Sequence, residues 1–153
     1  MPETTGTTET RVPTPRFNHV AMSVPADLLG EAGRADLLAF YGEVFGFEEL
    51  PTETVDQKTL VLRAYSNEQF LFLIADDTPM ACPRLDHFGM SVERMDELDA
   101  MLARARGFAE RDDRVDLIDK KADDHAGFLT LTSFYVGYLL PMMIEVQHFD
   151  WRS

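Results

Sequence analysis

The sequence has little of several features that would each define a class of protein. It contains one cysteine, Cys82, so no disulfide can form within the chain, and this fits a reducing compartment. Its 14 lysines and arginines are outnumbered by 27 aspartates and glutamates, which gives a net charge of -13. A charge of this sign argues against a nucleic-acid backbone or an anionic membrane surface as partner.

Long apolar runs are also missing. No stretch approaches the roughly 18 apolar residues that cross a bilayer. The first fifteen residues lack the basic start and apolar stretch of a signal peptide, and they are rich in Thr, Pro and Glu. We therefore expect a disordered tail over residues 1–15, no membrane partner and a cytoplasmic protein with a single domain over residues 16–153.

The sequence does contain an internal repeat, which sets the architecture of a chain wherever it occurs. The segment Arg16–Val24 and the segment Arg84–Val92 are identical at five of nine positions, with an offset of 68 residues. Both copies are predicted to be strands, and each carries a histidine, His19 or His87. The repeat predicts two related modules, over about residues 16–78 and 84–149.

Alternation within the repeated strand places each histidine beside small residues. Side chains two positions apart share a face of a strand, so His19, Ala21 and Ser23 point the same way. The second copy repeats this pattern around His87, with a glycine and a serine. The opposite face is bulky and apolar and suits packing under a helix. A histidine on a strand is usually structural, but space in front of both imidazoles favours a role as ligands.

The remaining elements repeat in the same order in both halves. Apolar residues at helical spacing predict helices over residues 34–45 and 93–106. Strands are expected at 16–24, 47–50, 59–65 and 69–75 in the first half, and at 84–92, 114–118, 127–135 and 141–149 in the second. The charged run 119–124 is predicted to be a loop. The expected fold is α+β, with two β-α-β-β-β modules whose sheets form a cup.

A carboxylate on the last strand adds to the two histidines. Glu145 stands between Ile144 and Val146, and a charge in a buried strand needs a partner. An arginine is one possible partner and a metal is another. Two histidines and one carboxylate with open positions suit Fe²⁺, Zn²⁺, Mn²⁺ or Ni²⁺. We therefore predict a metal site of His19, His87 and Glu145.

Other polar residues are weaker candidates. Gln147 shares the face of Glu145 and is expected to line a substrate pocket, whereas His148 lies on the opposite face. Tyr135 is a candidate catalytic residue that donates a hydrogen bond into the cup, and a core position is the alternative. His125 is expected in a solvated loop, with a role beside the site as the second possibility.

Several of these features together resemble the vicinal oxygen chelate superfamily. They are the paired modules, the strand-borne His19 and His87, the segment Phe40–Phe47 after the first helix, and Glu145 on the final strand. The resemblance covers about residues 16–149. The superfamily includes glyoxalase I, extradiol dioxygenases, methylmalonyl-CoA epimerase, fosfomycin-resistance transferases and the metal-free bleomycin-resistance proteins.

The resemblance implies metal ligands at His19, His87 and Glu145. A fourth ligand of the family would fall near Phe72 or Leu73, both apolar, so Phe72 is assigned to the substrate pocket instead. A three-ligand set is similar to extradiol dioxygenases and fosfomycin-resistance enzymes. His125, Tyr135 and Glu145 have the spacing of a dioxygenase signature, but the apolar segment Tyr138–Pro141 replaces its polar turn, so no specific reaction is assigned.

Three functions stay open at this point. The first is a metal-dependent dioxygenase, lyase or isomerase that binds a small oxygenated substrate through vicinal oxygens. The second is a binding or resistance protein that sequesters its ligand without turnover, and the third is a silent interaction domain. A homodimer is possible, since cups of this superfamily close within one chain or between two. The apolar segment Tyr138–Met143 is expected either at such a contact or in the core.

Overall fold

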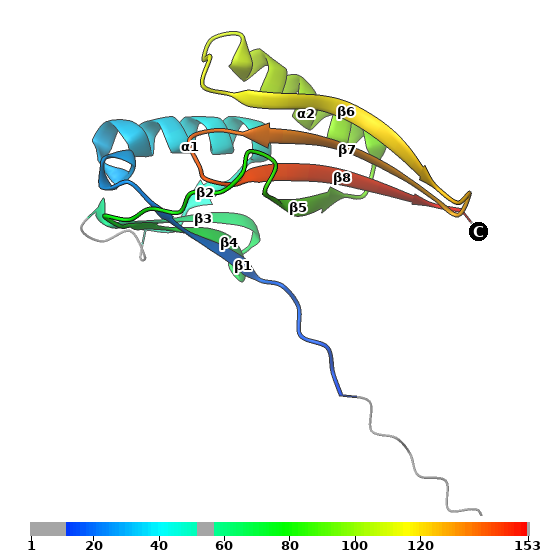
Figure 1. Ribbon diagram of the computed structural model, residues 1–153, viewed down its shortest axis with the longest axis horizontal. Helices are drawn as coiled ribbons and strands as arrows, with labels where there is room; N and C mark the ends of the chain where they lie inside the picture. Colours follow the sequence, from blue (N-terminus) through cyan, green and yellow to red (C-terminus); the bar gives the residue numbers. More distant parts are fainter. Residues whose placement is uncertain (1–11, 52–56, 153) are drawn as a thin grey trace, which may run out of the picture.

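The first module runs from β1 to β4 in the computed structural model, which describes residues 12–51 and 57–152 (Figure 1). Its elements are β1 (His19–Val24), a 3-10 turn η1 (Ala26–Leu29), α1 (Glu31–Phe45), β2 (Glu48–Glu49), β3 (Thr59–Ser66) and β4 (Gln69–Ala75). Of the predicted tail, residues 1–11 lie outside the described residues. Residues 12–18 are exposed and lead away from the module.

The second module repeats this order. Its elements are β5 (His87–Val92), α2 (Met95–Ala109), β6 (Asp116–His125), β7 (Leu129–Gly137) and β8 (Met143–Trp151). The sheets have the orders β1-β4-β3-β2 and β5-β8-β7-β6, so each opening strand is an edge strand. Each opening strand pairs in parallel with the last strand of its module, and the other pairs are antiparallel. The predicted α+β fold of two β-α-β-β-β modules is confirmed.

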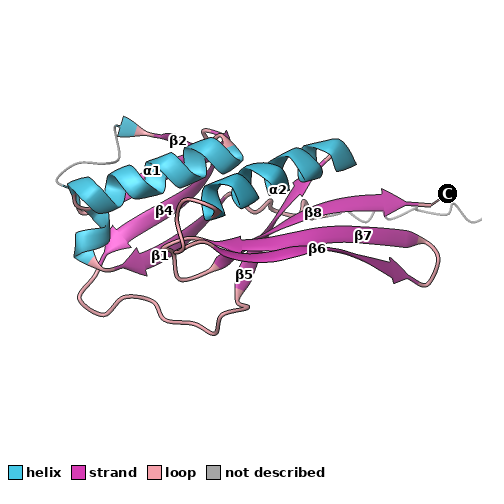
Figure 2. Cartoon of the chain, turned by 90° about the horizontal axis from the view of Figure 1, so that it is seen from above, coloured by secondary structure: helices cyan, strands magenta, loops and turns pink. Residues whose placement is uncertain are grey.

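Both helices cover the same side of the sheets and contact each other (Figure 2). Neither helix, nor any other in the described parts of the chain, has the length and apolarity to cross a membrane. The opposite sheet faces carry no helix. The face that holds His19, His87 and Glu145 is therefore the open one in each module.

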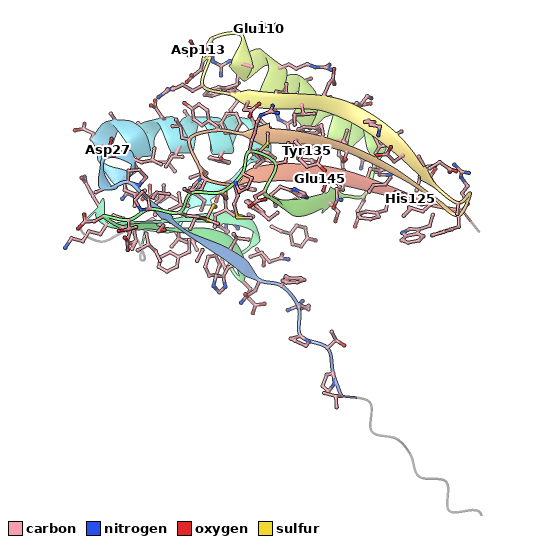
Figure 3. All side chains as sticks on the ribbon, in the orientation of Figure 1. Asp27, Glu110, Asp113, His125, Tyr135 and Glu145 are labelled. Atoms are coloured by element: carbon pink, nitrogen blue, oxygen red, sulfur yellow. The ribbon has the colours of Figure 1, made fainter. Side chains whose placement is uncertain are left out.

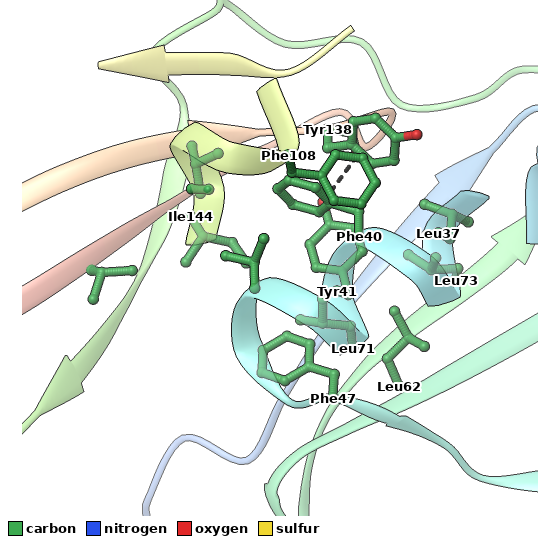
Figure 4. Packing of buried hydrophobic residues seen from close by; sticks show 14 of the residues in the cluster. Leu37, Phe40, Tyr41, Phe47, Leu62, Leu71, Leu73, Phe108, Tyr138 and Ile144 are labelled. Carbon is green, nitrogen blue, oxygen red and sulfur yellow. Dashed lines mark hydrogen bonds between the residues drawn. The ribbon is translucent and has the colours of Figure 1, made fainter. Parts of the chain in front are cut away.

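The hydrophobic core runs through both modules at the contact between the helices (Figure 4). The Phe40 ring of α1 lies against Phe108 of α2 at 5.1 Å and against Tyr138 at 4.5 Å between ring centroids. The Tyr41 hydroxyl donates to the Tyr138 carbonyl at 2.9 Å. Tyr138 is fully buried, so it has the core position that the sequence left open. Helical spacing did not single out Phe40, although it is the aromatic centre of the junction.

A polar network closes this junction at the surface. Arg114, which precedes β6, forms ion pairs with Asp36 of α1 at 2.9 Å and with Asp112 at 2.7 Å. The Tyr138 hydroxyl donates to Asp112 at 2.7 Å. The guanidinium of Arg114 and this hydroxyl hold the pKa of Asp112 well below its usual value. The network therefore ties the loop after α2 to the first module.

The prediction of a loop over residues 119–124 was wrong, because this run lies within β6. Lys121 is opposite Ser133 and Asp123 is opposite Leu131 in the β6–β7 ladder. Backbone pairing with β7 overrides the low strand propensity of the charged residues, whose side chains point to solvent and form ion pairs. Those pairs are Lys120 with Asp99, Lys121 with Asp123, and Arg106 with Asp119. His125 consequently ends a strand instead of lying in a loop.

Candidate functional site

His87 is fixed at the start of β5 by a backbone hydrogen bond. Its Nδ1 lies 2.8 Å from the carbonyl oxygen of Leu85, and its Nε2 lies 3.2 Å from Oε2 of Glu145. The imidazole side chain is 36% exposed, whereas that of Glu145 is 10% exposed. His87 and Glu145 are therefore brought together on the open face, as predicted.

The two partners of the His87 ring determine what its nitrogens can do. A carbonyl oxygen only accepts hydrogen bonds, so Nδ1 carries a proton. A neutral ring would then point the Nε2 lone pair at the Glu145 carboxylate, which is repulsive. Either a second proton or a metal cation between Nε2 and the carboxylate relieves this repulsion. A backbone carbonyl that orients a histidine in this way is the usual support of a metal ligand.

Glu145 is 7% exposed and is held by two polar neighbours on its own face of the sheet. Gln147 donates from Nε2 to Oε2 of Glu145 at 3.1 Å. Tyr135 lies opposite Glu145 in the β7–β8 ladder, and the two side chains lie together in Figure 3. Burial, followed by its hydrogen bond to Glu145, raises the pKa of Tyr135. Tyr135 therefore keeps its proton at neutral pH and lies at the site, not in the core.

Gly89 makes room for the amide of Gln147. It pairs with Glu145 across β5 and β8, and a Cβ built on Gly89 would lie 2.9 Å from Oε1 of Gln147. The side chain of Gln147 thus lies over Gly89 of β5, where there is no side chain in its way. The small residue beside His87 gives space to an amide that holds the carboxylate.

His19 lies apart from His87 and Glu145. Its ring stacks on Phe70 at 5.0 Å between centroids, and its Nδ1 lies 2.8 Å from Oδ1 of Asn18. Within residues 12–51 and 57–152, no three His, Cys, Asp or Glu side chains are close enough together to hold a metal ion. The chain therefore brings together two of the three predicted ligands.

Phe72 occupies the position in the first module that Glu145 has in the second. Ala21 pairs with Phe72 in the same register in which Gly89 pairs with Glu145. Phe72 is half-buried on the open face, two residues along β4 from Phe70, which pairs with His19. The first module thus lacks a carboxylate where the second module has one.

Three further residues from the sequence prediction lie away from the site. His125 is exposed at the far end of β6 (Figure 3). His148 lies on the helix side of β8, as expected, and its Nδ1 is buried without a hydrogen-bond partner among the described residues. The Cys82 thiol donates to the Pro141 carbonyl at 2.9 Å and contacts neither His87 nor Glu145 in the described structure.

Two cavities lie where the modules meet. One of about 410 Å³ is lined by His19, Phe70 and Gly89, among others, and thus by residues of β1, β4 and β5. The other, of about 970 Å³, is lined by Phe45 and Met101 of the helices and by Gly89 and Ser91 of β5, among others. Neither cavity includes His87 or Glu145. The His87–Glu145 pair therefore lies on the open face of the second sheet, outside both cavities.

Sequence reasoning missed the support around the predicted ligands. The Leu85 carbonyl that fixes His87 is a backbone group and has no residue-type signature. The role of Gly89 had a signal, since it is the only glycine in either copy of the repeated strand. Its partner Gln147 was identified from alternation along β8, and the structure places it beside Glu145.

No protein-family model and no curated protein matches the sequence. Solved structures do match the fold. A lactoylglutathione lyase from Agrobacterium tumefaciens is 16% identical at a TM-score of 0.61, over 90% of this chain and 96% of that one. The fosfomycin resistance protein FosX from Listeria monocytogenes is 14% identical at 0.59, over 86% and 89%. A putative glyoxalase family protein from Bacillus anthracis is 19% identical at 0.57, over 92% and 99%. The chain thus has the vicinal oxygen chelate fold.

Proposed function

We propose that this protein is a divalent-metal-dependent enzyme of the vicinal oxygen chelate type, which binds a small oxygenated substrate through two neighbouring oxygens. The observation that carries the proposal is the pairing of His87 Nε2 with the Glu145 carboxylate at 3.2 Å, while Nδ1 is held by a backbone carbonyl. A site built in this way suits a cation. Among its fold neighbours, FosX has been solved as a complex with Mn(II).

The proposed third ligand is His19 of a second copy of the chain. His19 is exposed on the open face of its module, but within one chain it does not reach Glu145. A homodimer in which the open face of the first module meets that of the second would bring His19 to His87 and Glu145. Each dimer would then hold two equivalent sites, as two-fold symmetry requires.

The residues present fit a metal of the Fe²⁺, Zn²⁺, Mn²⁺ or Ni²⁺ group. Imidazole nitrogen and carboxylate oxygen are ligands that these ions share, and two histidines with one carboxylate leave positions free for substrate. When bound, the metal would hold adjacent substrate oxygens and stabilise the negative charge that develops on them.

The chain's own residues supply orientation and a proton. Gln147 holds one oxygen of the Glu145 carboxylate in place, and Gly89 leaves room for that amide. Tyr135 retains its proton at neutral pH, because its pKa is raised, and its hydroxyl lies at the carboxylate. Tyr135 is therefore the candidate donor of a hydrogen bond to a substrate oxygen.

Elemental mass spectrometry of protein purified without chelators or a His-tag tests the proposal. We expect about one transition-metal ion per chain, lost in the His19→Ala, His87→Ala and Glu145→Ala variants. His125→Ala is a matched control, because His125 is exposed and distant from Glu145 (Figure 3), and it should retain the metal. Wild-type protein that stays free of metal after incubation with each ion would contradict the proposal.

A sequestering protein without turnover is the second candidate, and the first module favours it. At the position equivalent to Glu145 the first module has Phe72, and His19 is stacked on Phe70, so this open face is apolar. A binding protein needs such a surface but no metal. Its ligand affinity would be the same with and without chelator, whereas the enzyme would lose substrate binding.

A further inference from the structure

Strands β7 and β8 pair as a long ribbon. Along one half of the ribbon the apolar side chains face the helices, and along the other half they face the open side. On β8, Ile144 and Val146 face the helices and belong to the core, but the next residues on that face, His148 and Asp150, are polar. On the open face the order is reversed, with polar residues first and then Phe149 and Trp151. Because side chains alternate along a strand, the apolar side passes from the helices to the open face.

Strand β7 makes the same change at the same place. Phe134 and Val136 are in the core, whereas Thr130 and Thr132 follow on their face, and Leu129 and Leu131 lie on the open face. The pairing of β7 with β8 is continuous from Leu129–Trp151 to Val136–Ile144, without a bulge. A register slip therefore does not cause the change. Both strands present an apolar surface away from the protein's own core.

This surface is formed at the end of the ribbon, which projects beyond α2 in Figures 1 and 2. We call it the distal patch, and it consists of the exposed Phe128, Phe149 and Trp151 together with Leu131, which is half-buried, and Leu129, which is buried beneath them at 8% exposure. Trp151 is 63% exposed and Phe128 is 53% exposed. Their rings stack at 6.1 Å between centroids, and Phe149 stacks on Trp151 at 6.4 Å. Phe149 and Trp151 lie on one sheet face, and Phe128 lies in the turn just before β7. Exposed aromatic rings that stack in this way are typical of a surface that another molecule covers.

The same chain carries an exposed apolar segment of its own. Residues 12–18, which we call the arm, are all exposed, and Phe17 is 100% exposed. The arm is tied to the first module by an ion pair from Arg16 to Glu68 and by the Asn18 carbonyl, which accepts from the Phe70 amide. Phe17 also lines the smaller cavity between the modules, together with Phe88 and Met90. Figure 1 shows the arm leaving the body separately from the ribbon. Pro13 and Pro15 favour an extended segment, whose seven residues span roughly 20 Å.

We propose that the distal patch docks a second copy of this chain and that the arm of that copy, through Phe17, packs on Phe149 and Trp151. A second copy is favoured over another protein because the chain has both an uncovered aromatic surface and an uncovered apolar segment that fits it. Under two-fold symmetry two identical arm–patch contacts close the dimer, so neither remains exposed.

The apolar area is appropriate to such a contact. A fully buried aromatic side chain removes about 150–250 Å² from water. The exposed fractions of Phe17, Phe128, Phe149 and Trp151 thus represent on the order of 500 Å² per copy, against roughly 800 Å² per partner in a standard interface. Asp123 and His125, on the neighbouring edge strand, give the patch a polar rim.

Trp151 makes the proposal directly measurable, because it is the only tryptophan in the chain. In metal-free protein with EDTA, we expect its fluorescence emission to move to shorter wavelength as concentration rises. Acrylamide quenching should fall at least about twofold in parallel, as the side chain enters an interface core. Sedimentation velocity of the same samples should show conversion of monomer to dimer over the same concentration range.

The Phe17→Ser variant tests the arm. It should weaken the dimer at least about tenfold and keep the Trp151 emission at the exposed position, although Phe17 and Trp151 are not in contact within the chain as described. Tyr65→Ser is the matched control, because Tyr65 is an aromatic residue of β3 that is 87% exposed and lies outside the patch. It should dimerise as the wild type does.

Three results would overturn the proposal. They are a monomer at every concentration, a dimer in which Trp151 stays exposed and Phe17→Ser has no effect, and coverage of Trp151 only after an apolar small molecule is added.

A disulfide test is independent of folding effects. In a Cys82→Ser background, Phe17→Cys with Trp151→Cys should give a covalent dimer on oxidation, and a cross-link within one chain would contradict the exchange. Metal content is measured separately. A dimer that binds metal but is insensitive to Phe17→Ser would overturn the arm contact and leave the shared metal site standing, and a dimer that depends on Phe17 but binds no metal would do the reverse.

Discussion

The first strands of the two modules have nearly the same sequence, but the last strands place different residues near the histidine. Each places a histidine on an open sheet face beside small residues. In the second module the paired last strand supplies Glu145, and His87 is oriented toward it by the Leu85 carbonyl. In the first, the equivalent position is Phe72, and the ring of His19 lies against Phe70.

This difference shows that the repeated histidine strand does not make a site by itself. The last strand of the module decides whether the histidine gains a carboxylate or an aromatic neighbour. One module therefore has two of the proposed ligands and the groups that orient them, and the other has a single imidazole on an apolar face. The two kinds of open face are complementary, and the proposed dimer combines one of each.

The largest expected effect concerns the core that the two modules share. Phe40→Ala should destabilise the protein by about 3–5 kcal/mol, because it leaves a cavity against Phe108 and Tyr138. Urea unfolding followed by circular dichroism measures this loss, and we expect a single transition. A loss below about 1 kcal/mol, or two separate transitions, would show that the modules do not share one cooperative core.

The next effect sharpens the chemical contrast between the modules. Glu145→Gln keeps the shape of the side chain but removes its charge, and we expect at least about a hundredfold loss of metal affinity. Phe72→Leu, at the equivalent position of the first module, should leave that affinity unchanged. Competition with a chromogenic chelator measures both. Equal losses in the two variants would remove the distinction between the modules.

A smaller effect is expected from Gly89, whose counterpart in the first module is Ala21. Gly89→Ala pushes the amide of Gln147 away from Glu145, because the new methyl group would lie 2.9 Å from Oε1. We expect about a tenfold loss of metal affinity, as for other supporting residues. Gly107→Ala is the control, since a Cβ there meets nothing within 4 Å, and it should retain full affinity. An unchanged affinity in Gly89→Ala would contradict the role of Gln147.

The smallest effect is a pH dependence at the module junction. Burial raises the pKa of Tyr41 above its ordinary value of 10.0, so the folded protein keeps a proton that the unfolded chain releases. The stability that this proton contributes is therefore fully present below pH 10 and is lost as pH rises above it. Tyr41→Phe should reduce this slope by up to about 1.4 kcal/mol per pH unit. Unfolding at pH 8 and at pH 11 measures the change, and equal slopes in both proteins would refute it.

Much of the fold was predictable because its determinants are local. Strand alternation and the repeat identified both histidine strands, and alternation placed Gln147 beside Glu145. The prediction failed at β6, where pairing with β7 overrides the loop preference of the charged residues 119–124. The helical pattern likewise did not single out Phe40, whose burial depends on residues of the other module.

The arrangement of the site was less predictable because it depends on how the modules meet. The sequence pattern indicated that His19, His87 and Glu145 belong to one set. No local pattern indicates that His19 lies apart from the other two within one chain. Phe72 is the counterpart of Glu145 only through the register of the strand pairs, which the sequence alone does not give. The change of the apolar side chains from one face of β7 and β8 to the other is present in the sequence. It can be recognised only once the pairing between the two strands is known.

The most direct test of a site shared between two copies is complementation between ligand variants. His19→Ala and His87→Ala should each bind no metal alone. When equal amounts are unfolded together and refolded, half of the dimers are mixed, and each mixed dimer has one intact site. The mixture should therefore regain about one quarter of the wild-type metal content, measured by elemental mass spectrometry. A mixture that stays free of metal, or a His19→Ala protein that keeps its metal, would contradict the shared site.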